Sequence, residues 1–451
     1  MEILDSLRRH RQKERASFHM PGHKNGAAFL GTGVASDWLA YDVTELDGTD
    51  CLCRPTDAIL RSEEQAARLY GAARAFYLVN GASCGILSMF YAFFREGDSV
   101  LVDRAGHRSV GNALALCGLN PVYLAPSVDP ARGVPLGLTA EQVRSALRRY
   151  PEVKGVFITS PNYYGMCSEI AEIARAAHDA GIPLLVDEAH GAHFPFDARF
   201  PQGALRQGAD VSVVSLHKSL PCPNQTALLL LRDPSKADEM QAAVIVFQTT
   251  SPSYALMIYI EAGLDFAAQH GRERTDLLLE WTRPFRRYQT DDPFKMLMSF
   301  EENGIPGRCA EQILREEFGI YAELCDRKNV LLMASWGNSA ADFELLAEGV
   351  RRLASMKGTC APVESAVACF SEGRPELSPR AVRGQETEWV SVRCAAGRVS
   401  AGAVTAFPPC IPVLLPGERI TKEQADVVCE LSEGQDMDGV ERGAIRVVKE
   451  K

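Results

Sequence analysis

One lysine of this sequence is a candidate catalytic residue because of its position. Lys218 follows Val211–Ser215, an apolar run typical of a buried strand, after only two intervening residues. A lysine at such a place is costly unless its charge is neutralised or its amine is covalently engaged. An amine with a lowered pKa forms Schiff bases and transfers protons readily. Ser215 and His217, on either side of Leu216, could reach a phosphate group carried by a ligand held there.

An acid ends a second apolar run. Asp187 follows Leu184, Leu185 and Val186, and it precedes a turn that contains His190 and His193. Such an acid could serve a metal ion, a ribose or a ring nitrogen. Beside a pyridine nitrogen it would keep the ring protonated, which makes the ring an electron sink. A metal site built from Asp187, His190 and His193 is the alternative, but these residues belong to a turn rather than to one helix face.

Two further segments complete the pattern. The small residues of Asn80–Gly85 lie between a strand and a helix, where backbone N–H groups bind phosphate, although a plain strand-to-helix turn would look the same. His107, in the loop after another strand, could stack on a pyridine ring. A phosphate turn, a stacking histidine, an aspartate and then a lysine about thirty residues later together predict pyridoxal 5'-phosphate (PLP) as cofactor.

These residues depend on apolar strands that alternate with helices. We expect the strands at 75–79, 99–102, 121–124, 155–159, 183–186, 211–215 and 227–231. Continuous apolar strands of this kind indicate an α/β fold with a parallel or mostly parallel sheet covered on both faces. Ligands of such sheets bind at the carboxyl ends of the strands. The predicted site residues follow these ends.

Length and composition set the remaining expectations. A chain of 451 residues suits a large and a smaller domain, and we expect an N-terminal arm (1–60), a large PLP-binding domain (61–292) and a smaller α+β C-terminal domain (293–451). The net charge of −10 argues against a nucleic-acid partner. Thirteen scattered cysteines, with no secretory signal and no apolar run long enough to cross a membrane, favour a soluble cytoplasmic protein without disulfides or a metal site.

Several motifs, in order along nearly the whole chain, resemble the Orn/Lys/Arg decarboxylase family in its short form, without an extra N-terminal wing domain. The motifs that carry the resemblance are 18–26, 42–46, 80–83, 160–165, 187–193, 215–218, 249–254, Gly397-Arg398 and the proline-rich segment 408–418. The resemblance implies the fold of the aspartate aminotransferase class, known as fold type I of the PLP enzymes. It also implies a lyase that decarboxylates arginine, lysine or ornithine to an amine and CO2, with polyamine formation as its setting.

The resemblance also assigns roles. Lys218 would hold PLP as a Schiff base, Asp187 would pair with the ring nitrogen, His107 would stack on the ring, and Lys218 or His217 would return a proton to the substrate. The cofactor-binding positions implied are Lys218, Asp187, His107, Gly81, Ala82, Ser83, Cys84, Asn162, Ala189, His190, Ser215, His217, Thr250 and Ser251. Thr250 and Ser251 would reach the phosphate of the neighbouring subunit, in a homodimer with shared sites or a larger assembly.

The chain departs from the family pattern at several points. Its His107 loop reads Arg104-Ala105-Gly106-His107-Arg108-Ser109, where an Asn-Cys-His-Lys-Ser-like string is usual. Cys84 stands where Thr or Val is common, and Cys410 stands where Gly is. Cys51-Leu52-Cys53-Arg54 replaces a more acidic, histidine-bearing stretch, and this change bears on substrate choice rather than on cofactor chemistry.

A basic substrate needs an acidic partner, because a buried unpaired cation is costly. The candidates are Glu45, Asp47, Asp50 and Glu418, each of which could equally be a structural carboxylate.

Two alternatives to decarboxylation remain open. One is another reaction on the same fold, such as transamination, for which Arg393 or Arg398 could hold the substrate carboxylate. The other is a non-catalytic regulatory paralogue. The presence of Lys218, Asp187 and His107 together argues against that second alternative.

Overall fold

A computed structural model describes residues 1–14, 20–21, 24, 37–358, 370–406, 411–432 and 437–450. Of the motif at 18–26, only Met20, Pro21 and Lys24 fall within these ranges, and Pro408, Pro409 and Cys410 lie outside them. The chain divides into a first unit, Met1–Ala92 with Glu188–Arg274, and a second unit, Phe93–Asp187 with Thr275–Lys451. The predicted division into an arm and two domains stays a prediction. No described helix is both long enough and apolar enough to cross a bilayer.

The first unit contains an antiparallel group of strands in the order β1-β7-β6. The bounds of these strands are β1 Arg74–Leu78, β6 Val211–Ser215 and β7 Ala227–Leu231. Its helices are α1 Glu2–Lys13, α2 Ala58–Tyr70, α3 Gly81–Phe93, α7 Leu216–Ser219, α8 Ala237–Phe247 and α9 Tyr254–Thr282, which runs on into the second unit. Its short 3-10 turns are η2 Asp37–Tyr41, η3 Phe194–Phe196, η4 Ala204–Gln207 and η5 Pro234–Lys236. Every residue of β6 and β7 is buried, as their apolar sequences require.

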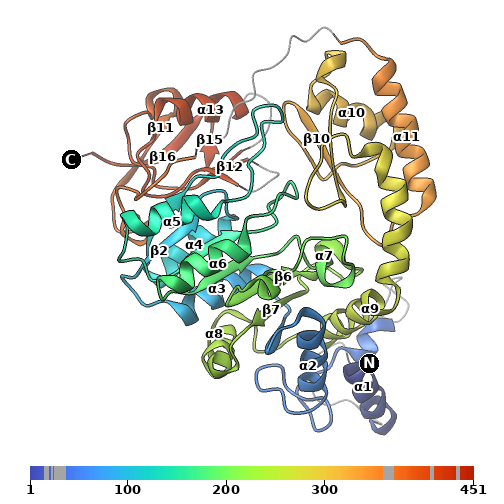
Figure 1. The fold of residues 1–451 in the computed structure, drawn as a ribbon. Coiled ribbons are helices and arrows are strands. Elements are labelled where there is room, and N and C mark those ends of the chain that lie inside the picture. The colour runs from blue at the N-terminus through green and yellow to red at the C-terminus, as the bar shows by residue number, and fades with distance from the viewer. Residues whose placement is uncertain are drawn as a thin grey trace. The chain divides into compact units, whose positions relative to one another are not determined.

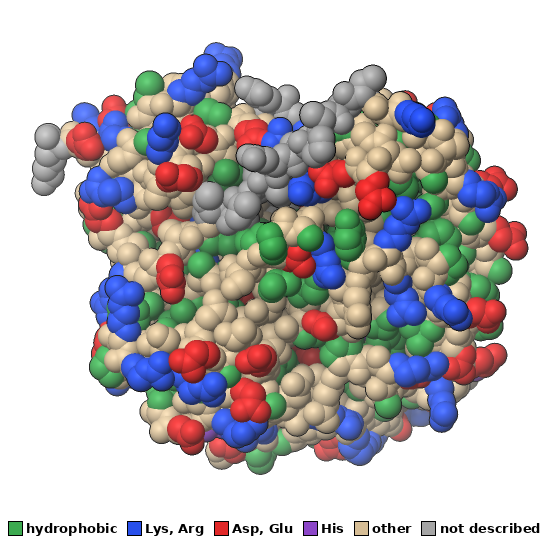
Figure 2. Space-filling model, turned by 45° about the horizontal axis from the view of Figure 1, so that its top comes forward, with side chains coloured by type: hydrophobic (Ala, Val, Ile, Leu, Met, Phe, Trp, Pro, Cys, Tyr) green, Lys and Arg blue, Asp and Glu red, His purple; other side chains and the backbone are tan. Residues whose placement is uncertain are grey.

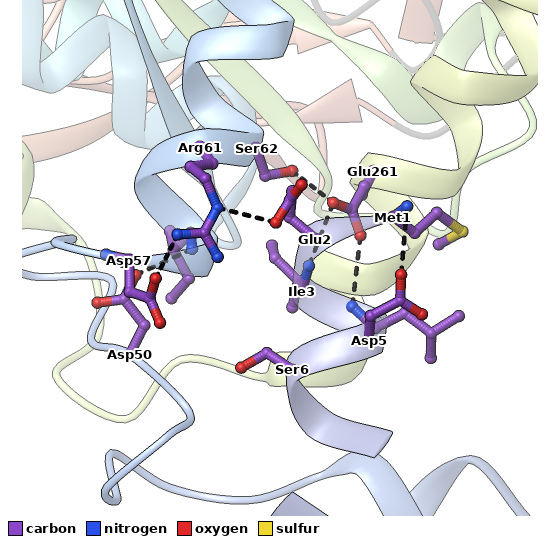
Figure 3. Close-up of polar contacts among 12 residues, drawn as sticks. Met1, Glu2, Ile3, Asp5, Ser6, Asp50, Asp57, Arg61, Ser62 and Glu261 are labelled. Atoms are coloured by element: carbon purple, nitrogen blue, oxygen red, sulfur yellow. Dashed lines mark hydrogen bonds and ion pairs between the residues drawn. The ribbon is translucent and has the colours of Figure 1, made fainter. Parts of the chain in front are cut away.

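A buried carboxylate fixes the N-terminal helix within this unit. Glu261 of α9 accepts hydrogen bonds from the backbone N–H groups of Ile3 (3.2 Å) and Leu4 (3.4 Å) and from the Ser62 hydroxyl (3.0 Å). Figure 3 shows Glu261 pointing at the start of α1, with Arg61 joining Glu2 nearby. The first N–H groups of a helix have no partner inside the helix and attract negative charge, so Glu261 acts as a cap supplied from another helix.

The second unit contains four parallel strands in the order β5-β4-β2-β3. These strands are β2 Ser99–Asp103, β3 Asn120–Leu124, β4 Val156–Thr159 and β5 Leu184–Asp187. The helices that connect them are α4 Arg108–Cys117, α5 Ala140–Arg149 and α6 Ile170–Asp179. A capping box of Thr139 and Gln142 starts α5. With the first unit's strands, all seven strand predictions are confirmed to within one residue at each end.

The rest of the second unit is α+β, with three small antiparallel sheets ordered β8-β10-β9, β11-β16-β15 and β13-β12-β14. Their strands are β8 Lys295–Ser299, β9 Leu324–Cys325, β10 Asn329–Met333, β11 Thr387–Ser391, β12 Val404–Ala406, β13 Pro412–Leu414, β14 Met437–Asp438, β15 Val440–Glu441 and β16 Ala444–Val448. The helices here are α10 Gly307–Phe318, α11 Ala340–Ser355, α12 Pro379–Val382 and α13 Lys422–Ser432, and the 3-10 turns are η6 Arg283–Phe285, η7 Glu301–Asn303 and η8 Val392–Cys394. Figure 1 shows α10 between α11 and the sheet that contains β10. The last two sheets share a core of buried side chains such as Leu414, Val428 and Ile445.

Candidate active site

The predicted cofactor lysine lies in a one-turn helix that directly follows β6. In the first unit, the Nζ atom of Lys218 is 3.0 Å from the Nε2 atom of His190. His190 is buried, and Lys218 is half-buried. An ammonium group can only donate, so a charged Lys218 requires an unprotonated Nε2 on His190. The structure therefore brings together two of the predicted residues, one from each of two strand ends.

His217 is oriented by a backbone carbonyl. Its Nδ1 atom is 3.1 Å from the carbonyl oxygen of Thr226, which can only accept, so Nδ1 carries the proton. Burial, together with the charge of Lys218, holds the pKa of His217 below its ordinary value, against the opposing effect of the Thr226 carbonyl. A neutral His217 in this tautomer has no proton on Nε2. This arrangement favours Lys218 over His217 as the acid that returns a proton to the substrate.

The predicted phosphate turn joins β1 to α3. Gly81 has a φ of +76°, which favours glycine, and its N–H donates to the carbonyl of Gln225 (2.8 Å). Ala82 and Ser83 follow in the first turn of α3, where backbone N–H groups have no partner within the helix. Cys84 is buried, and burial raises the pKa of its thiol to about 11, so this cysteine is a packing residue rather than a nucleophile.

The segment that carries Thr250 and Ser251 is tied to the same region. Gln248, just before it, accepts a hydrogen bond from the N–H of Val79 (2.9 Å) and donates to the carbonyl of Tyr77 (3.3 Å). Both Thr250 and Ser251 are exposed. Their hydroxyls are therefore accessible from outside the chain at the end of β1.

A pocket of about 300 Å³ in the first unit gathers several of the predicted residues. Its lining is Met20, Pro21, Asp42, Val43, Thr44, Glu45, Ser251, Pro252 and Ser253. The structure thus places Glu45 and Ser251 around one hollow. Among the described lining residues there are two carboxylates and no lysine or arginine. This charge pattern suits a cationic group.

The other acidic candidates are placed differently. Asp47 is exposed and does not line this pocket. Asp50 accepts hydrogen bonds from four backbone N–H groups, those of Cys51, Thr56, Asp57 and Ile59, at 2.8–3.0 Å. Glu418, in the second unit, is buried and bonded through both oxygens to the Arg104 guanidinium. The carboxylates of Asp50 and Glu418 are therefore occupied by structural contacts, which leaves Glu45 the best placed of the four.

The second unit holds Asp187, the last residue of β5, with 3% of its surface exposed. Asp103 ends β2 in the same unit and is also buried. Burial raises the pKa of Asp103 to about 6, and the charge of Asp187 adds to that effect. Thr159, paired in register with Asp187, has a buried hydroxyl with no hydrogen-bond partner among the described residues. Polar groups thus gather at the carboxyl ends of these parallel strands, where the fold places ligands.

Asp103 was missed by the sequence analysis. The signal was available, because Asp103 ends an apolar strand just as Asp187 does. A buried carboxyl with a raised pKa at a strand end that faces other polar groups is a feature of functional sites.

His107 and Asn162 also lie in the second unit, in the loops after β2 and β4. His107 is the N-cap of α4, and its Nδ1 atom accepts a hydrogen bond from the N–H of Ser109 (3.2 Å). Asn162 is buried, and its side chain binds the backbone of Pro135, Tyr164 and Met166. Asn162 therefore shapes its own loop.

Ala189 is buried in the first unit, and its carbonyl accepts from the N–H of Ser215 (3.3 Å), so the turn after Asp187 is held against β6. Within the described ranges, no group of three His, Cys, Asp or Glu side chains is placed to hold a metal ion.

Comparison with known proteins decides the family. The model of the Orn/Lys/Arg decarboxylase major domain matches residues 3–291, and that of the family's C-terminal domain matches residues 371–438. The chain belongs to the Orn/Lys/Arg decarboxylase family. It is 30% identical to an arginine decarboxylase of Bacillus subtilis, over 100% of this chain and 98% of that one. It is 31% identical to an arginine decarboxylase of Halalkalibacterium halodurans, over 98% and 96% respectively.

A second relative from Bacillus subtilis, the uncharacterized protein YaaO, is 35% identical over 95% of this chain and 94% of its own. Among solved structures, the constitutive lysine decarboxylase of E. coli superposes with a TM-score of 0.81 at 20% identity, covering 99% of this chain and 82% of the other. Lysine decarboxylase A from Pseudomonas aeruginosa gives 0.83 at 18% identity, with 99% and 80% covered. The predicted fold type I architecture is confirmed, and the chain is a basic amino acid decarboxylase of this family.

Proposed function

We propose that this enzyme uses PLP to decarboxylate L-arginine to the corresponding amine and CO2, with L-lysine and L-ornithine as the alternative substrates. We choose a basic substrate because of one pocket. Its lining includes Glu45 and Asp42, and no lysine or arginine is among the described lining residues. Arginine is favoured within that class because relatives named arginine decarboxylase align over nearly the whole chain at 30–31% identity.

The donors present suit PLP. Lys218 would supply the amine that holds the cofactor aldehyde, and the N–H groups of Gly81, Ala82 and Ser83 would suit its phosphate. Asp187, buried and acidic, suits a protonated ring nitrogen, and His107 suits the ring face. When bound, PLP supplies an electron sink for the bond that loses CO2. The Thr159 hydroxyl, buried and without a partner in the described part of the chain, supports the presence of a polar ligand near Asp187.

The remaining steps belong to the side chains of the chain itself. Glu45 would pair with the cationic end of the substrate and so hold it in the pocket. Lys218 would return a proton to the substrate carbon, and the Nε2 atom of His190, 3.0 Å from its Nζ atom, helps to hold the lysine side chain in place. His217 holds its proton on Nδ1 toward the Thr226 carbonyl and so has none on Nε2 to donate.

The deciding experiment is product analysis of the PLP-loaded enzyme with L-arginine, L-lysine and L-ornithine. We expect CO2 and amine in equal amounts, fastest from arginine, and complete loss in Lys218→Ala together with the visible absorbance of the lysine-bound cofactor. Lys236→Ala is the matched control, because Lys236 is exposed and pairs with Glu239 at 3.2 Å, away from the candidate site residues on the chain. A keto acid in place of CO2 would establish transamination, and no product with cofactor bound would contradict the substrate assignment.

We further propose a homodimer in which Thr250 and Ser251 of each subunit contact the phosphate held by the other. Their exposure at the end of β1 supports this. Mixing Lys218→Ala with a Thr250→Ala/Ser251→Ala variant tests it, because a mixed dimer regains one intact site. Recovery of activity on mixing two inactive variants supports shared sites, and its absence contradicts them. We assign the reaction to the cytoplasm and to polyamine formation.

A further inference from the structure

A second pocket of about 340 Å³ lies wholly within the second unit, and we call it the arginine pocket. Its charged lining residues are Arg108, Arg383 and Arg446, and the amide side chains of Asn112 and Gln385 also line it. No aspartate or glutamate is among its described lining residues. A hollow with three arginines and no carboxylate is unexpected in a chain with a net charge of −10.

Small residues on one face of α4 make the room. Arg108, Gly111, Asn112 and Ala115 are spaced three and four positions apart, so they share a face, and all four line the pocket. Gly111 has ordinary helical backbone, and a Cβ there would make only an ordinary contact, 3.5 Å from Leu415. Neither the turn geometry nor a close approach requires glycine at this position. A side chain at Gly111 larger than a methyl group would therefore extend toward Leu415, which also lines the pocket, and take up part of its volume.

Strand alternation aims Arg446 at this pocket. In β16, Ile445 and Val447 are fully buried in the C-terminal core, so Arg446 between them points outward. Its guanidinium donates to the Thr387 hydroxyl at 2.8 Å, and Thr387 also lines the pocket. Arg446 has no carboxylate partner among the described residues.

Two acidic residues near this pocket form ion pairs with residues that do not line it. Glu386 pairs with Lys449 at 3.2 Å, and Glu388 pairs with Arg398 at 2.5 Å. Arg108 has an exposed partner, Asp438, at 3.1 Å, which an incoming anion would have to displace or share. Arg383 forms no ion pair within the described part of the chain. Two of the three guanidinium groups thus face the hollow without a compensating negative charge.

We propose that the arginine pocket binds a small organic phosphate. Guanidinium groups bind phosphate through paired N–H donors, and the Asn112 and Gln385 amides add further donors. The lining also includes apolar residues, among them Pro379, Val382 and Leu415, which suit the organic part. Nothing in this site overlaps Lys218 or the phosphate turn, which belong to the first unit.

The test is calorimetric titration of AMP, and separately of inorganic pyrophosphate, into the PLP-loaded full chain in phosphate-free, low-salt buffer. PLP fills the catalytic phosphate site, so binding there does not contribute. We expect one AMP bound per chain, bound more tightly than pyrophosphate because of the apolar wall, with affinity that falls as salt is added.

Three variants make the result specific. Arg383→Gln removes charge, and Ala115→Leu removes room while keeping every arginine; each should weaken AMP binding by about tenfold or more. Arg351→Gln is the matched control, since Arg351 is an exposed arginine of α11 outside the pocket, and it should bind AMP as the wild type does. Circular dichroism checks that each variant is folded. No saturable AMP binding, or equal affinity in all variants, would overturn the proposal.

Discussion

Arg104 and Glu418 form a two-point ion pair that is almost completely buried. Nε of Arg104 donates to one carboxylate oxygen at 2.6 Å and a terminal nitrogen donates to the other at 2.8 Å, with 0% and 2% of the two side chains exposed. Arg104 also donates to the carbonyls of Pro412 and Val413, and Glu418 accepts from the N–H of Leu415. The pair therefore ties the loop after β2 to the turn after β13.

Breaking this pair should be severely destabilising. Glu418→Gln or Arg104→Met leaves one buried partner without its counter-charge, and we expect the free energy of unfolding to fall by about 3–5 kcal/mol. Urea unfolding measures this loss. Because Arg104 lies in the loop that carries His107, cofactor affinity should fall as well.

The matched comparison is Glu317→Gln, which breaks the exposed pair of Glu317 with Arg352 and should cost about 1 kcal/mol or less. A similar small cost for Glu418→Gln would contradict the structural role given to the buried pair. It would also return Glu418 to the set of substrate-binding candidates.

The sequence made the strands, the fold class and the positions of Lys218 and Asp187 predictable, because each depends on local hydrophobic pattern. An acid or lysine at the end of an apolar run is visible within ten residues of chain. The roles of the other acids were not predictable in this way. Glu418 binds a partner 314 positions away, and nothing local distinguishes such a structural carboxylate from one that binds substrate.

Asp50 shows a different limit of the sequence. Its role depends on the chain folding back so that four N–H groups converge on one carboxylate, which is a property of the turn rather than of the residue type. The tautomer of His217 likewise follows from a single contact with the Thr226 carbonyl. Local pattern fixes which residues reach a strand end, whereas their protonation depends on tertiary neighbours.

Glu63 should make stability fall with rising pH. Burial raises the pKa of Glu63 from 4.5 to about 8, against the attraction of Arg74 at 3.3 Å. Between these two values the folded chain keeps a proton that the unfolded chain has lost, so unfolding becomes easier as pH rises through this window. In Glu63→Gln this part of the pH dependence should disappear. Urea unfolding of both proteins at about pH 5 and about pH 8 measures the difference.

Glu64→Gln is the control for Glu63, because Glu64 is the next residue of α2 and is exposed. It should keep the wild-type pH dependence. If Glu63→Gln also keeps it, Glu63 is ionised in the folded chain and the Arg74 pair dominates over burial.

Asp50 should show the opposite sign. Although burial opposes them, the backbone N–H groups of Thr56, Asp57, Cys51 and Ile59 hold the pKa of Asp50 below its ordinary value of 3.8. Its contribution to stability is therefore present above about pH 3.8 and is lost as pH falls through the lower folded-state value. Asp50→Ala should lower the free energy of unfolding by about 2 kcal/mol or more at neutral pH, measured by urea unfolding. Asp47→Asn, at an exposed acid of the same segment, should change it little.

Glu45 should determine how well the basic substrate is recognised. Glu45→Gln keeps the size of the side chain and its bond with Thr44, but it removes the charge that would face the substrate cation. We expect kcat/KM for arginine to fall by about 10–100-fold, mainly through KM, because the contact is made in ground and transition states alike. Initial rates of CO2 release with varied arginine measure both constants, and Asp47→Asn should leave them unchanged. If kcat/KM is unaltered in Glu45→Gln but falls in Asp42→Asn, then Asp42, the second carboxylate of the same pocket, binds the substrate cation. If kcat/KM is unaltered in both variants, this pocket does not bind the substrate side chain.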